Sequence, residues 1–149
     1  MAEPRPGVVL DSSAVIALLL DESGAGTVEM LLRSSDARMS TVNAAEVVDV
    51  LIRVHRGDPD EVSARIDELL SSVIRPIEAS LELATRAGEL RARLFERQSR
   101  RVSLADCFVL ATAEPGDRIA TTDATLAEIA RDEGIAVVAL DFDLRPALS

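Results

Sequence analysis

The chain has 149 residues, a length that suits one domain with one hydrophobic core and is too short for two independent ones. Hydrophobic residues make up 48% of the chain and aromatic residues only 2%, so the core must be aliphatic, which favours helices packed on a sheet of aliphatic strands. The net charge of −10 argues against binding nucleic acid through a broad basic surface, and because all 16 cationic residues are arginine, a mechanism that needs a catalytic lysine is excluded.

The sequence contains no segment that we expect to target or insert the chain. Residues 1–7 carry charged residues and two prolines, and we expect them to form a flexible tail on a single domain spanning residues 1–149. The longest apolar run, residues 14–20, is far shorter than the ~20 residues that a membrane span needs. The only cysteine, Cys107, cannot form an internal disulfide and suits a small buried apolar role. A cytoplasmic protein without a membrane contact is therefore expected.

The first half of the chain alternates strand and helix patterns. A short aliphatic run at residues 8–10 ends at Asp11, and Ser12 and Ser13 then precede an apolar run, which predicts a strand, an acidic turn and a helix capped by serine. The segments predicted after it are a helix at 27–33, a strand at 37–40, a helix from Asn43 to the break at 57–59, and a helix from Pro59 to about Ser72.

The second half continues the alternation. Residues 73–77 are a weaker strand candidate because Pro76 cannot donate a hydrogen bond to a ladder. The segments predicted after it are the longest helix at 80–98, a loop at 98–101, a helix at 103–113, a strand at 119–121, a helix from Thr122–Asp123 to Gly134, and a strand at 136–140. Strands alternating with helices predict an α/β fold with a mostly parallel central sheet flanked by helices.

Four carboxylates occupy the same kind of junction in this pattern. Asp11 and Asp123 directly follow predicted strands, and Glu46 and Asp106 lie one turn into helices that start at the same end of the sheet. Ligands of parallel sheets bind beyond the carboxyl ends of the strands, so we expect the four side chains to converge on one rim.

A set of carboxylates without histidine or cysteine suits a hard cation. Mg²⁺ and Mn²⁺ take oxygen ligands from a few carboxylates together with waters and substrate phosphates. Such ions polarise a phosphate and lower the pKa of an attacking water, so hydrolysis of a phosphodiester is the natural chemistry. Bound cations would also reverse the local sign of the charge in a chain that otherwise repels nucleic acid.

Each carboxylate also has an ordinary structural explanation. Three of them stand at spacings typical of helix starts, namely Asn43 with Glu46, Ser103 with Asp106, and Thr122 with Asp123. Asp11 can likewise satisfy backbone donors in the turn to Ser13. Taken singly, each acid is as well explained by capping as by metal binding, whereas four acids at equivalent junctions favour a site.

Four motifs surround these acids, in the order VVLDSSA at residues 8–14, TVNAAE at 41–46, SLADC at 103–107 and ATTD at 120–123. In this order they resemble the motifs of PIN-domain nucleases, and most closely those of the VapC-type toxins of bacterial toxin–antitoxin operons. The resemblance covers the chain from Val8 to about Leu140. Each motif is weak by itself, and the ordered set is fairly specific.

The resemblance implies a role for each motif residue. Asp11, Glu46 and Asp106 would be the central metal ligands and Asp123 the fourth, more variable acid, while Ser13 would support Asp11, and Asn43 or Thr122 would orient the site. It further implies a PIN-like fold with a parallel sheet flanked by helices, Mg²⁺ or Mn²⁺ as cofactor, a structured RNA such as tRNA or rRNA as substrate, a homodimer, and a small VapB-like antitoxin protein that silences the toxin.

Arginines on the longest predicted helix are the best candidates for contacts with an RNA backbone. Arg86, Arg93 and Arg97 share one face that continues toward Arg100 and Arg101. Helical pairs of Glu82 with Arg86 and of Glu89 with Arg93 would occupy two of the five. Arg97, Arg100 and Arg101 therefore remain as the candidate RNA contacts.

Two other functions compete with the nuclease. An aspartate at the end of the first strand also serves aspartate-based phosphotransfer domains, but those need a lysine near the site, and the position two residues after Asp11 is Ser13 instead of a second acid. Alternatively, the same fold acts as a non-catalytic RNA- or protein-binding module. Metal affinity and metal-dependent RNA cleavage separate that module from an enzyme.

Overall fold

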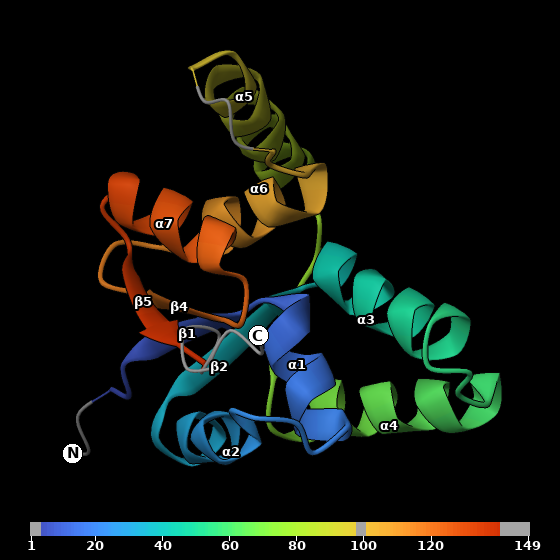
Figure 1. Ribbon diagram of the computed structural model, residues 1–149. Coiled ribbons are helices and arrows are strands. Elements are labelled where there is room, and N and C mark those ends of the chain that lie inside the picture. Colours follow the sequence, from blue (N-terminus) through green and yellow to red (C-terminus); the bar gives the residue numbers. More distant parts are fainter. Residues whose placement is uncertain (1–3, 98–100, 141–149) are drawn as a thin grey trace, which may run out of the picture.

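A five-stranded sheet forms the centre of the molecule (Figure 1). The computed structural model describes residues 4–97 and 101–140, without the side chains of residues 96 and 97. The strand order in the described part is β3-β2-β1-β4-β5, and every neighbouring pair is parallel. The predicted α/β fold with a mostly parallel sheet flanked by helices is therefore confirmed.

The strands and helices follow the predicted order closely. The strands are β1 (Gly7–Leu10), β2 (Asp36–Ser40), β3 (Arg75–Ile77), β4 (Arg118–Thr121) and β5 (Ala136–Ala139). The helices are α1 (Ser12–Leu19), α2 (Ala25–Ser34), α3 (Thr41–Arg53), α4 (Pro59–Ser72), α5 (Leu81–Arg97), α6 (Leu104–Thr112) and α7 (Ala124–Asp132). Of the helices in the described residues, none is both long and apolar enough to cross a membrane.

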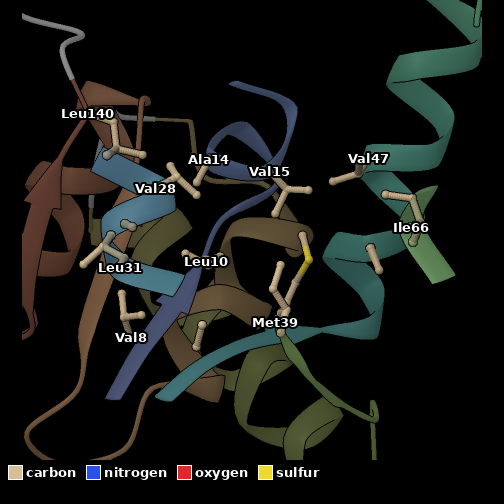
Figure 2. Close-up of a cluster of buried hydrophobic side chains, with 14 of the residues drawn as sticks. Val8, Leu10, Ala14, Val15, Val28, Leu31, Met39, Val47, Ile66 and Leu140 are labelled. Carbon is tan, nitrogen blue, oxygen red and sulfur yellow. The ribbon is translucent and has the colours of Figure 1, made fainter. Parts of the chain in front are cut away.

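Two layers of apolar side chains cover the two faces of the sheet. Val8 and Leu10 of β1 pack into a cluster with side chains of α1, α2, α3 and α4, as Figure 2 shows, while Val9 between them packs into a second cluster with α5, α6 and α7. Successive residues of a strand point to opposite faces, so a central parallel strand must be apolar at every position. Cys107 lies fully buried in the second cluster, as expected for a small apolar residue.

Helix starts account for most of the differences from the predicted boundaries. The third helix does not begin at Asn43, because Ser40 caps it by accepting a hydrogen bond from the backbone N–H of Val42. The fourth helix begins at the predicted Pro59, with Asp58 as its cap. A proline at the first helical position loses no helical hydrogen bond, which makes such a start readable from sequence.

The amino-terminal end of the sheet contains a buried ion pair. Arg38 of β2 donates to the carboxylate of Asp117, which immediately precedes β4, and both residues are at most 9% exposed. Gly7 begins β1, one residue inside the segment expected to be a tail, and pairs with Asp36. A Cβ atom at Gly7 would lie 2.1 Å from Asp117 Oδ1, so any larger residue there would force this ion pair to shift.

Candidate metal centre

The candidate site lies where the strand order reverses. From β1 the chain proceeds to β2 on one side, and β4 lies on the other side of β1. Asp11 follows the last residue of β1 directly, and its backbone N–H donates to Ala120 O of β4 at 3.0 Å. The carboxyl ends of two neighbouring parallel strands at such a reversal form the usual ligand crevice of this class of sheet.

Asp11 is the most constrained of the four predicted acids. It is 4% exposed, and its Oδ1 accepts a hydrogen bond from the backbone N–H of Ser12 at 2.8 Å, which makes Asp11 itself the cap of α1 in place of the predicted serines. Its Oδ2 accepts from Ser13 Oγ at 2.7 Å and from Thr121 Oγ1 at 2.8 Å. The carboxylate is thus fixed in position and orientation by the start of α1 and the end of β4.

Thr121 is a site residue that the sequence analysis missed. Its hydroxyl is fully buried at the end of β4 and also accepts from the backbone N–H of Asp123 at 2.9 Å. Thr122, which the resemblance placed in the supporting role, contributes its backbone N–H to Ser13 Oγ at 3.0 Å. The pairing of β1 with β4 explains this contact. Leu10 lies opposite Ala120, so the residues that follow them, Asp11 and Thr121, lie next to each other.

Glu46 and Asn43 reach the same crevice from α3. Asn43 is fully buried, and its Nδ2 donates to Glu46 Oε1 at 3.3 Å and to Ala105 O of α6 at 3.1 Å. The amide thus orients Glu46 and ties α3 to the first turn of α6. Within the described residues, Asn43 Oδ1 is buried without a hydrogen-bond partner, which is costly for a polar atom unless a water or ion completes it.

Asp106 and Asp123 are candidate site residues that also cap helices. Ser103 and Asp106 form the predicted capping box at the start of α6, with Asp106 Oδ2 accepting from Ser103 N at 3.1 Å. Asp123 caps α7, its Oδ1 accepting from Thr125 N at 2.9 Å and from Leu126 N at 3.2 Å. The proposed capping roles are thus correct for both acids, although each keeps a second oxygen that accepts no hydrogen bond from the described residues.

Electrostatics link all four acids. Burial raises the pKa of Asp11, and the charge of Glu46 raises it further, against the hydrogen bonds from Ser13 and Thr121. Burial likewise raises the pKa of Asp106, and the charges of Asp11 and Asp123 add to it. Asp11 and Asp106 therefore each lie close to the negative charge of a neighbour, and like charges held close together favour either protonation or a bound cation.

The donor set fits a hard divalent cation. It consists of carboxylate oxygens and the unpartnered amide oxygen of Asn43, with no nitrogen or sulfur ligand, which is the chemistry of Mg²⁺ and Mn²⁺. Among residues 4–97 and 101–140, no three acidic, histidine or cysteine side chains are already grouped tightly enough to hold an ion.

The structure describes only some of the arginines that were predicted to contact RNA. Arg101 is exposed, whereas the side chain of Arg97 and all of Arg100 lie outside the described part of the chain. The expected pair of Glu89 with Arg93 is wrong, because Arg93 forms its ion pair with Glu133 at the end of α7. The side chain of Arg93 therefore links α5 to the end of α7 through this ion pair.

Comparison with known proteins places the chain in a family. The PIN domain matches residues 8–131, which include all four predicted acids. The chain therefore belongs to the PIN-domain family.

Relatives narrow this assignment. VapC ribonuclease Mb2780c of Mycobacterium bovis and Ribonuclease VapC42 of Mycobacterium tuberculosis are each 32% identical to the chain over 111 residues, covering 72% of this chain and 82% of theirs. Within the PIN-domain family the chain is thus a VapC-type protein.

Solved structures share the fold. VapBC-1 of nontypeable Haemophilus influenzae matches with a TM-score of 0.65 at 17% identity, over 90% of this chain and 98% of that one. VapBC2 of Rickettsia felis, solved with a DNA fragment from its promoter, matches with a TM-score of 0.67 at 17% identity, over 89% and 98%. VapC20 of Mycobacterium tuberculosis, described as a toxin that cleaves the sarcin–ricin loop, matches with a TM-score of 0.58 at 22% identity, over 92% and 93%.

Proposed function

We propose that the chain is a cytoplasmic, metal-dependent endoribonuclease that hydrolyses RNA phosphodiester bonds as the toxin of a VapBC-type pair. The observation that carries the proposal is the buried carboxylate of Asp11, which faces the charges of Glu46 and Asp106 while no arginine pairs with it among the described residues. A bound cation would compensate these negative charges. We infer RNA as the substrate class because the similar VapC proteins are ribonucleases.

Asp11, Glu46 and Asp106, with Asp123 as a fourth acid, would hold Mg²⁺ or Mn²⁺. The ion would polarise the scissile phosphate and lower the pKa of the attacking water. The chain's own contribution is preorganisation. Ser13 and Thr121 fix one oxygen of Asp11, and the backbone N–H of Ser12 fixes the other, so the carboxylate needs no rearrangement during the reaction.

Asn43 performs a second positioning task. Its amide nitrogen binds Glu46 and the first turn of α6 together, which keeps Glu46 and Asp106 on the same rim. Hydrolysis then joins a water oxygen to phosphorus and breaks one phosphorus–oxygen bond. A carboxylate of the rim accepts a proton of the attacking water, and the released sugar oxygen takes up a proton from solvent.

The competing phosphotransfer function is disfavoured by the same contacts. Both oxygens of Asp11 accept hydrogen bonds, and the residue at the position of the second acid, Ser13, is one of the donors. A carboxylate that is held in this way is a weakened nucleophile, and the chain has no lysine to assist it.

The direct test is cleavage of RNA by the purified chain. Mg²⁺ or Mn²⁺ should support it, a chelator should stop it, and Asp11→Asn or Asp106→Asn should lower the rate by orders of magnitude. Asp49→Asn, an exposed acid of α3 paired with Arg53, is the matched control and should cut normally. Cleavage that persists in EDTA contradicts the metal-dependent mechanism, and no cleavage under any metal leaves the non-catalytic binding module.

Substrate and partners complete the proposal. An acidic domain cannot hold a duplex by its backbone alone, so unpaired or loop RNA, such as a loop of tRNA or rRNA, should be cut faster than a duplex of the same sequence. A homodimer and a small VapB-like antitoxin are proposed on the kinship with VapC proteins. A basic side chain of that antitoxin would satisfy the acidic rim through charge-assisted hydrogen bonds.

A further inference from the structure

Arg91 and Phe95 form an unusual pair on α5. They are four residues apart, one helical turn, and the guanidinium carbon of Arg91 lies 5.3 Å from the centre of the Phe95 ring. Arg91 Nε also donates to Val102 O at 3.3 Å. Val102 immediately precedes Ser103, the residue whose capping box holds Asp106. The pair is therefore attached to the segment that leads into the acidic rim.

Arg91 differs from most of the arginines whose contacts the structure describes. Arg38, Arg53, Arg75 and Arg93 each form an ion pair with a carboxylate. Arg91 forms none among the described residues, since its contacts are a carbonyl oxygen and an aromatic ring. The chain has a net charge of −10, so few of its cations are free to bind phosphate. Arg91 is therefore a candidate phosphate contact, because its charge is not paired with a described carboxylate and it contacts the segment that leads to Asp106.

Phe95 is equally unusual for its exposure. The chain has three phenylalanines and no tryptophan or tyrosine, and Phe108 is buried in the core at 8% exposure. Phe95 is 59% exposed, which leaves most of a large apolar side chain in water. Exposed aromatic rings next to arginine are the usual platform on which proteins stack unpaired bases.

The two flanks of α5 have different tasks. Arg93 lies on the flank that faces α7 and is held there by Glu133, whereas Arg91 lies on the flank that faces the start of α6. The face of Arg86, Arg93 and Arg97 that the sequence suggested for RNA thus turns toward α7 at Arg93. The opposite flank is the one that contacts the start of α6, the helix that carries Asp106.

We propose that Phe95 stacks an unpaired base of the RNA substrate and that Arg91 contacts the adjoining phosphate, which places the strand next to Asp106. This inference rests on the proposed nuclease function and specifies how the site selects single-stranded RNA. Stacking is tolerant of sequence because every base has an aromatic face, so the pair would select for unpaired structure and not for a particular base.

The test measures RNA binding by the full-length chain carrying Asp11→Asn, so that the probe stays intact. The probes are a fluorescent single-stranded oligouridylate and an abasic RNA of the same length. Phe95→Ala should weaken binding of oligouridylate by about five- to 150-fold, as expected for losing one stacked base, and should leave abasic RNA unchanged. Phe95→Trp should restore binding. Met30→Ala, which removes another exposed side chain far from the site on α2, is the control.

Arg91→Gln should weaken binding of both probes and lower the slope of log affinity against log salt by about 0.7, the value for one phosphate on a single strand. Arg33→Gln, on α2, makes the same change of charge and should have no effect. Equal binding of oligouridylate by Phe95→Ala and its parent overturns the inference, and so does an equal loss for abasic RNA. A change in sedimentation mass caused by Phe95→Ala overturns it too, because the ring would then belong to a protein interface.

Cleavage by chains with Asp11 intact separates this inference from the proposed function. If the parent cuts RNA and Phe95→Ala cuts it with unchanged KM, the stacking site is wrong and the nuclease stands. If the parent cuts no RNA with any metal but Phe95→Ala still loses affinity only for the probe with bases, the binding site stands and the nuclease is wrong. A raised KM with nearly unchanged kcat supports both.

Discussion

Asp11 shows how one residue serves as a cap and as a candidate ligand. Its Oδ1 caps α1, and its Oδ2 binds two hydroxyl groups from residues 108 positions apart, Ser13 and Thr121. Capping needs an oxygen acceptor, and metal binding needs a negative charge. Because asparagine keeps the acceptor and removes the charge, it separates the two roles.

We expect the metal-free melting temperature of Asp11→Asn to equal or exceed that of wild type. The hydroxyls of Ser13 and Thr121 can rotate to accept from the new amide, and repulsion from Glu46 disappears. Mn²⁺ should then stabilise wild type by about RT ln(1 + [L]/Kd) and the variant much less. Thermal melts with and without EDTA measure both effects.

A loss of stability in the asparagine variants, without any effect of metal, would show that the acids only cap helices. If Asp11→Asn and Asp106→Asn each lose roughly 0.3–1 kcal/mol, as expected when a charge is removed from a helix start, and if metal changes neither melting curve, the acids act through helix dipoles alone. Asp49→Asn serves as control because that acid is exposed and is paired with Arg53.

Cys107 follows Asp106 directly but should be inert. It is fully buried in the core, and burial, with a contribution from the charge of Asp106, raises its pKa to about 11. A thiol needs its anionic form and access to react. We therefore expect no reaction with a disulfide reagent at pH 8 in the native chain and one equivalent after denaturation in urea. A fast native reaction would show that α6 opens frequently.

The elements of the sheet are joined at their amino-terminal end by Arg38 and Asp117. The side chain of Arg38 extends from β2 to Asp117, the residue before β4. Its guanidinium nitrogens also lie within 4.0 Å of carboxylate oxygens of Asp36 and Glu114. Removing one partner of a buried pair leaves an uncompensated charge, which costs far more than the pair contributes.

Arg38→Met should therefore destabilise the chain by about 3–5 kcal/mol in urea denaturation. Adding Asp117→Leu to that variant should recover much of the loss, because two apolar side chains then face each other. Arg53→Met, which breaks an exposed pair on α3, should change the midpoint little. A loss in Arg38→Met no larger than that in Arg53→Met would mean that water reaches the buried pair.

At the scale of the whole molecule, the net negative charge of the chain favours a basic protein as its partner. A chain with a net charge of −10 and an acidic rim should bind a small basic protein more readily than it binds generic nucleic acid. We expect expression of the chain alone to slow growth, co-expression of an adjacently encoded partner to restore it, and Asp11→Asn to be harmless by itself. Growth curves and co-purification measure this. If high expression never slows growth and no protein co-purifies, the toxin assignment is wrong while the nuclease assignment survives.

Local patterns predicted the parts of this molecule whose causes are local. The helix Pro59–Ser72 was predictable because proline and aspartate mark its start, and the buried strands were predictable because both of their faces are apolar. The four acids were identified by their position at strand ends and helix starts. Asn43 was misassigned as a helix start because Ser40, three residues earlier, is the residue that caps this helix.

Contacts between distant residues were decided only by the tertiary structure. Thr121 reaches Asp11 through strand register, Arg93 of α5 reaches Glu133 at the end of α7, and Arg91 reaches the start of α6 on the opposite flank. Sequence spacing describes one helix or strand at a time and cannot say which neighbour a side chain meets. The sequence by itself therefore determined the fold class and the acids, and packing determined how those acids are held and which arginine reaches the start of α6.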